Sequence, residues 1–240
     1  MNKFFNGFVL MCFWQMVLTA CGNSAPSDQQ KETERVHESN SQAVEKESRY
    51  AEMLKKFKAV SFDTLKVYYR YDDKKFMGKE LTLKETKIFP LGIEENYFGK
   101  LSGVYACYRF EIDSTRLGLI ARTPSEYESS SVKLFIFDKK ADKVLDNYLE
   151  LGQMFGDAGD FFSKASWLFK TKNNEIHSLV YDYESYDHQV DDTADLRIDE
   201  WHSYALINCM NEKFDTLSTN GAQLKKRFRR VLKEEEQKND

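Results

Sequence analysis

The sequence contains little proline, only three residues in 240. Large side chains are abundant by contrast, because 14% of the residues are aromatic and 41% are hydrophobic. Disordered chains are typically rich in proline and poor in aromatic residues. The composition therefore argues against disorder in residues 46–236, which are numerous enough for one domain with a packed core.

An excess of positive charge is also absent. The chain has 35 Lys and Arg against 39 Asp and Glu, a formal net charge of −4. Nucleic-acid-binding domains normally present a basic surface. We therefore expect no nucleic-acid partner.

Motifs typical of enzymes and metal sites are missing too. The sequence has no Gly-x-Ser-x-Gly, no phosphate loop and no EF-hand loop. No two of its four histidines (His37, His177, His188 and His202) have the His-x-x-x-His spacing of a zinc site. We expect neither a metal nor a cofactor, although a catalytic triad need not be local in sequence.

The N-terminus has the three zones of a secretory signal. Lys3 supplies the positive charge, residues 8–18 are mainly apolar, and small residues precede Cys21. The apolar stretch is shorter than the roughly 20 residues that a spanning helix needs. Residues 18–21 (Leu-Thr-Ala-Cys) resemble the lipobox of bacterial envelope lipoproteins, and this resemblance covers residues 1–21 only.

The resemblance implies that residues 1–20 are removed and that the Cys21 thiol then carries lipid. Two or three acyl chains such as palmitate would hold the protein on a membrane. Gly22 follows the cysteine, and by the family's sorting rule this favours the outer membrane of a Gram-negative bacterium. The alternatives are an uncleaved anchor helix or a cysteine placed by chance. Residues 21–45 are then a flexible tether and residues 237–240 a disordered tail.

Five times along the chain, a run of aromatic or β-branched residues enters a short polar turn and is followed by another such run. The turns are residues 72–75, 113–115, 138–143, 171–175 and 211–213. This pattern is typical of β-hairpins, so we predict about ten strands. The predicted fold is mainly β, a single antiparallel meander closed as a barrel or folded as a sandwich.

An amphipathic helix is predicted on each side of the meander, because apolar residues recur there at helical spacing. They are Tyr50, Met53, Leu54 and Phe57 in the first helix, and Leu224, Phe228, Val231 and Leu232 in the second. Ser218, Thr219 or Asn220 can cap the second helix. That helix also carries six Lys and Arg, which we interpret as a solvated face because three glutamates follow.

Two cysteines, Cys107 and Cys209, lie within the predicted domain. In an oxidising envelope compartment they could form a disulfide. Such a bridge would close a loop of about 100 residues and contribute up to about 4.7 kcal/mol in the chain-entropy model. The alternative is a pair of buried free thiols that pack as small apolar residues.

Two stretches are candidate ligand sites. The first is the glycine-rich segment 152–160, in which Asp157 and Asp160 could hold a hard cation. The simpler interpretation is a tight connection between two hairpins. The second is acidic and contains Asp182, Glu184, Asp187, His188, Asp191, Asp192 and Asp195. It could bind calcium or supply an acid/base pair, but a solvated acidic loop after a strand is the usual meaning of such a run.

Our leading hypothesis for function is a non-catalytic binding or assembly module. Its partners would be the membrane, through the N-terminal lipid, and an envelope protein or glycan. The alternatives are a carboxylate-dependent glycan hydrolase that uses residues 182–195, or a β-barrel carrier of a small apolar ligand.

Overall fold

The structure is a computed structural model that describes residues 48–90, 103–125 and 129–236. The predicted signal, the lipobox, the tether and the C-terminal tail lie outside these described residues. Lipidation at Cys21 therefore stays a prediction.

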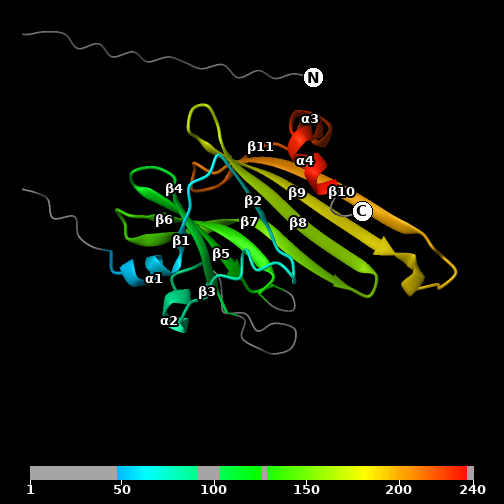
Figure 1. Cartoon of the computed structure of the whole chain (residues 1–240), viewed down its shortest axis with the longest axis horizontal. Coiled ribbons are helices and arrows are strands. Elements are labelled where there is room, and N and C mark those ends of the chain that lie inside the picture. Colours follow the sequence, from blue (N-terminus) through cyan, green and yellow to red (C-terminus); the bar gives the residue numbers. More distant parts are fainter. Residues whose placement is uncertain (1–47, 91–102, 126–128, 237–240) are drawn as a thin grey trace, which may run out of the picture. The chain divides into compact units, whose positions relative to one another are not determined.

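The described residues form one large, mostly antiparallel β-sheet of 11 strands with a few short helices, which confirms the predicted mainly β fold. The strands are β1 (Lys58–Ala59), β2 (Thr64–Tyr68), β3 (Lys79–Glu80), β4 (Tyr105–Glu111), β5 (Arg116–Thr123), β6 (Ser131–Asp138), β7 (Lys143–Asp157), β8 (Asp160–Lys170), β9 (Ile176–Asp187), β10 (Ile198–Asn208) and β11 (Asp215–Ser218). Their order is β1-β4-β5-β6-β7-β8-β9-β10-β11, with β2 beside β8 and β3 beside β4 (Figure 1).

Four of the five predicted hairpins are confirmed. They join β4 to β5, β6 to β7, β8 to β9 and β10 to β11 at the predicted turns. The first prediction was wrong, because β2 does not fold back after residues 72–75 but pairs with β8, while β3 pairs with β4. The glycine-rich segment is the expected tight connection, and its turn at residues 158–159 joins β7 to β8.

Strand β7 changes its partner along its length. Residues up to Gln153 pair with β6, and residues from Gln153 to Asp157 pair with β8. The rest of that edge of β8 pairs with β2. Both halves of the sheet contribute to one central apolar cluster, in which Ile120 of β5 and Leu168 of β8 are completely buried. The change of partner therefore folds the sheet over a shared core.

Helices cover the outer faces of both halves. Helix α1 (Ala51–Lys56) buries Met53 and Leu54 against β4–β6, as predicted. Helices α3 (Gly221–Arg227) and α4 (Arg229–Glu236) bury Leu224 and Leu232 against β8–β10. The predicted C-terminal helix is thus two helices, separated at Phe228.

Two local signals explain where the helices begin. Asn220, one of the three predicted caps, begins α3 by accepting a hydrogen bond from the Gln223 N–H at 3.1 Å. The short helix α2 (Leu83–Thr86) was not predicted, although Thr82 and Glu85 form a capping box at its start.

Cys107 and Cys209 are free and buried, so the disulfide alternative was wrong. Both belong to the central cluster. Cys107 lies at a bulge of β4, and its thiol donates a hydrogen bond to the Phe76 carbonyl at 3.2 Å. Burial raises the pKa of each thiol to about 12. The second alternative, buried thiols that pack as apolar residues, is the one observed.

Candidate binding surface

Strands β7 to β10 continue beyond the packed clusters and form a surface that we call the outer sheet (Figure 1). It comprises residues 153–164 and 181–203, including the connection with the short 3-10 helix η1 (His188–Val190). Every residue of the outer sheet is half-buried or exposed. The last fully buried residue is Gly152 on β7 and Val180 on β9, and the first is Ala165 on β8 and Leu206 on β10. Both faces of the outer sheet are therefore accessible to some degree.

One face, which we call the tryptophan face, carries a row of four cross-strand neighbours. They are Phe155 on β7, Phe162 on β8, Glu184 on β9 and Trp201 on β10. The Phe155 and Phe162 rings stack with centroids 5.0 Å apart and an interplanar angle of 24°. Trp201 is 54% exposed, and Glu184 is exposed beside it. The row thus presents aromatic rings on both sides of an accessible carboxylate.

The next row of the tryptophan face, toward the core, is polar. Lys164 Nζ lies 2.5 Å from Asp182 Oδ1, and the Ser203 hydroxyl donates to the other carboxylate oxygen at 3.3 Å. The same Lys164 Nζ lies 5.6 Å from the centroid of the Phe162 ring, within cation–π range. The charge of Asp182 is therefore compensated inside the sheet.

The row at the tip of the tryptophan face is acidic. Asp157 and Asp160 are direct partners across a two-residue turn in which Ala158 and Gly159 both have positive φ. Further along the row, Asp199 accepts a hydrogen bond from His188 Nε2 at 2.8 Å, and this contact lowers the pKa of the carboxyl. The tip therefore places three acidic side chains close to the aromatic row.

The opposite face, which we call the tyrosine face, carries a ladder of rings. Its members, in order of contact, are Phe161, Tyr183, His202, Tyr181 and Tyr204, with successive centroids 5.1 to 6.0 Å apart. The Tyr181 hydroxyl lies 2.8 Å from His202 Nδ1, and the Tyr183 hydroxyl donates to Glu200 at 2.6 Å. Burial and the neighbouring Glu200 raise the pKa of Tyr183. The Tyr181 and Tyr183 hydroxyls thus bond to side chains of the neighbouring strand β10, which is typical of cross-strand packing.

The outer sheet is strongly acidic. It contains ten Asp and Glu but only two basic residues, Lys164 and Arg197, which gives a net charge of −8. The whole chain has a net charge of only −4. The negative charge is thus concentrated on one part of the fold, where it produces a local potential that attracts cations.

The structure brings four of the five predicted ligand-site residues to one face. Asp157, Asp160, Asp182 and Glu184 lie on the tryptophan face, spread over three strands. Asp187 ends β9, and its side chain caps η1 by accepting from the Gln189 N–H at 2.9 Å. In the described part of the chain, no three His, Cys, Asp or Glu side chains are grouped as a metal site would require.

Sequence reasoning missed the aromatic members of the row, Phe155, Phe162 and Trp201. It placed the strand ends too early and interpreted all residues after Glu184 as a loop, whereas β9 continues to Asp187. The signal that could have identified the row is the mixing of aromatic and acidic residues within residues 155–162 and 199–201. Aromatic and acidic residues occur together on each face of such strands, so neither face is consistently apolar. This is expected of a sheet that no other layer covers.

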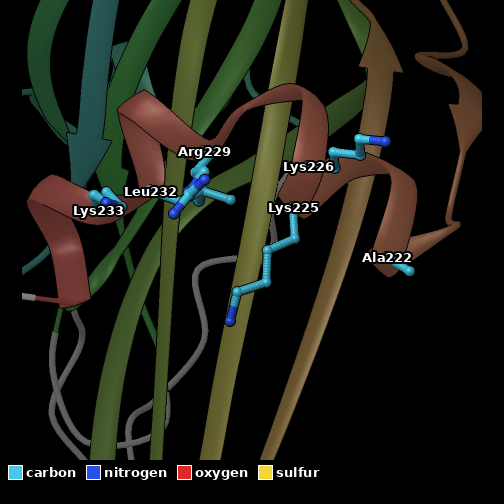
Figure 2. Close-up of a pocket in the computed structure, with 6 residues that line it drawn as sticks. All are labelled: Ala222, Lys225, Lys226, Arg229, Leu232 and Lys233. Atoms are coloured by element: carbon cyan, nitrogen blue, oxygen red, sulfur yellow. The ribbon is translucent and has the colours of Figure 1, made fainter.

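A second surface feature lies on the helices α3 and α4, which cross the strands below them (Figure 2). An open pocket of about 430 Å³ is lined by Ala222, Lys225, Lys226, Arg229, Leu232 and Lys233. The Lys225 and Lys226 side chains extend in different directions from α3 (Figure 2). The four cations therefore do not converge on one point, which supports the solvated face predicted from the sequence.

No helix among the described residues has the length and apolar character needed to cross a membrane. Comparisons with protein-family models, curated proteins and solved structures found no match to this chain.

Proposed function

We propose that this chain is a lipid-anchored protein of the cell envelope and that its folded domain is a non-catalytic binding module. The recognition surface is the tryptophan face. The observation that carries the proposal is its row of Phe155, Phe162, Glu184 and Trp201, which lies on a sheet beyond the packed core. The resemblance to the lipobox supplies the anchor at Cys21 and the outer membrane as its place.

The exposure of these side chains supports a binding role. Aromatic area that remains in contact with water contributes nothing to the hydrophobic stability of the fold, and burying it under a partner would contribute about 25 cal/mol per Å². Tryptophan is also among the residues that most often dominate the binding energy of an interface. Trp201, with 54% of its surface exposed, is the leading candidate for this role.

The hydrolase alternative has less support. A glycosidase needs two carboxyl groups about 5 to 9.5 Å apart that face each other across the scissile bond. Asp182 and Glu184 instead lie side by side on β9, on an open sheet face, and Asp182 is paired with Lys164. This arrangement suits recognition better than acid/base catalysis.

The carrier alternative would require an apolar cavity inside the folded sheet. The central cluster supplies large side chains to that space, and Leu134, Ile136 and Leu151 among them are completely buried. The tryptophan face thus remains the better supported ligand surface.

The anchor is tested by metabolic labelling with a palmitate analogue in a Gram-negative host. We expect label on the wild-type chain and recovery in the outer-membrane fraction. The Cys21→Ala variant should lose both properties. Label on this variant, or an unlabelled wild-type protein, would contradict the anchor without bearing on the tryptophan face.

The recognition surface is tested by photo-crosslinking of the acylated protein in membranes. Phe161 and Phe162 are adjacent in sequence but lie on opposite faces of β8, so each is replaced in turn by benzoylphenylalanine. We expect a discrete cross-linked species from position 162 and little or none from position 161. Equal cross-linking from both positions would refute the assignment of the tryptophan face.

A further inference from the structure

We propose that the tryptophan face binds a basic segment of a protein partner, and that a Lys or Arg side chain of this segment enters the slot between Phe162 and Trp201, above Glu184. This inference rests on the proposed function and specifies the chemistry of the ligand.

The register of three strands defines the slot. Phe162 and Trp201 are the two cross-strand neighbours of Glu184, one on each side. Adjacent strands lie about 4.8 Å apart, so the two aromatic residues are about 10 Å apart across the carboxylate. A cation above Glu184 would thus lie between the two aromatic residues, and a cation–π interaction with either ring requires it to come within about 6 Å of the ring centroid.

The fold already contains the same chemistry one row away. Lys164 Nζ is paired with Asp182 at 2.5 Å and also lies over the ring of Phe162 at 5.6 Å. Lys164 therefore combines a carboxylate with an aromatic ring, as we propose for the ligand. Among the described residues, no lysine or arginine forms an ion pair with Glu184.

The charge of the outer sheet favours a cationic partner over a neutral one. Its net charge is −8, and Asp160 and Asp199 lie on the tryptophan face in the row next to Glu184. A second cation of an extended segment could therefore find a carboxylate a few ångströms from the slot. A neutral glycan would gain nothing from this field, whereas a basic segment would be attracted and steered by it.

The aromatic geometry points the same way. Phe155 and Phe162 stack on each other at 24°, so they cover part of the ring surface on which a sugar would lie. Glu184 is the cross-strand neighbour of Phe162 on its other side, and Lys164 Nζ lies 5.6 Å from the centroid of the Phe162 ring, so a bound cation would share this ring with Lys164. A single charged side chain needs only part of this ring and the indole of Trp201.

The test uses the full-length acylated protein in detergent and decalysine as the probe. Binding is followed by calorimetry and by the fluorescence of Trp201, the more exposed of the two tryptophans within the described domain. We expect saturable binding that weakens steeply as salt is added, because the charges on an exposed face are screened. Decalysine with acetylated side chains should not bind.

Matched variants separate the slot from general electrostatic attraction. Phe162→Ala and Trp201→Ala should each weaken binding by roughly threefold to fivefold, the size expected for one exposed cation–π contact. Glu184→Gln should weaken it by up to about fivefold. The controls are Phe161→Ala on the tyrosine face and Glu212→Gln in an exposed turn, and both should bind like the wild type.

Two results would overturn the inference and leave the binding module intact. The first is decalysine binding that is the same for Phe162→Ala, Trp201→Ala and the controls, since this would reflect charge alone. The second is binding of chitotetraose instead of decalysine, lost in Trp201→Ala, since this would identify a glycan site. If benzoylphenylalanine at position 162 gave no cross-linked species in membranes, by contrast, the proposed function itself would be refuted.

Discussion

Gly152 lies directly against the backbone of Tyr68. A β-carbon on Gly152 would be 2.7 Å from the Tyr68 Cα and 2.9 Å from its carbonyl carbon. Gly152 precedes Gln153, the residue at which β7 changes partner from β6 to β8, and Tyr68 ends β2. The absence of a side chain therefore allows β2 and β7 to approach closely where the sheet folds over its core.

The first prediction follows from this contact. Gly152→Ala should lower the free energy of unfolding by roughly 2 to 3 kcal/mol, because backbone atoms must move to admit the methyl group. Urea denaturation followed by circular dichroism would measure the loss. Gly221→Ala at the start of α3 is a matched control that should change stability by less than about 1 kcal/mol. Equal stability of Gly152→Ala and wild type would show that the close approach is not a constraint.

The second prediction concerns the turn between β7 and β8. Ala158 has φ of 48°, a left-handed conformation that costs a non-glycine residue roughly 1 kcal/mol. Asn-Gly is strongly preferred in two-residue turns of this kind. Ala158→Asn, which creates Asn-Gly with Gly159, should therefore stabilise the protein by about 0.5 to 1 kcal/mol and raise its melting temperature.

A helical alanine provides the comparison for this turn. Ala222→Gly in α3 should lower stability by up to about 1 kcal/mol, because glycine is unfavourable in a helix. A lower melting temperature for Ala158→Asn would contradict the left-handed turn.

The third prediction is a pH dependence at the β4–β5 turn. Burial raises the pKa of Asp113, but hydrogen bonds from Arg116 and Thr115 outweigh it and bring the pKa to about 2. The pKa in the unfolded chain is about 3.9. Because the folded value is the lower one, Asp113 contributes stability above about pH 4 and loses this contribution as the pH falls toward 2.

Denaturation at a series of acidic pH values measures this effect. Allowing for the partial exposure of the carboxyl, we expect wild type to lose roughly 1 kcal/mol through this group. Asp113→Asn cannot titrate and Arg116→Ala removes the main donor, so both should lose less stability over the same range. Parallel pH profiles for all three proteins would rule out the contribution.

The strands and most turns were predictable because their signals are local. Each confirmed turn contains an Asp or Asn between two apolar runs, and these residues favour turns through their own side chains. The partner of β2 could not be predicted, because alternation identifies a strand without identifying its neighbour. Helix α2 was missed because it is only four residues long, too short for a periodic pattern.

The candidate surface was predicted only in part. The acidic residues of β9 were conspicuous because they are dense in the sequence. The aromatic neighbours of Glu184, however, are Phe162 and Trp201 on the two adjacent strands. Such cross-strand neighbours depend on register, which connects residues far apart in the chain. An uncovered sheet also lacks the burial pattern by which a strand is normally recognised.

The fourth prediction concerns the two thiols of the central cluster. Because burial raises the pKa of Cys107 and Cys209 to about 12, almost no thiolate is present near neutral pH, and the thiolate is the reactive species. Iodoacetamide should therefore leave both unmodified in the native protein and modify both in concentrated guanidinium. Mass spectrometry of the peptides that contain Cys107 and Cys209 would show whether each of these two thiols has been modified. As a control, Asn173→Cys in the exposed β8–β9 turn should react at once under native conditions. A disulfide-linked pair of the Cys107 and Cys209 peptides, found in a digest made without reductant, would contradict the free thiols.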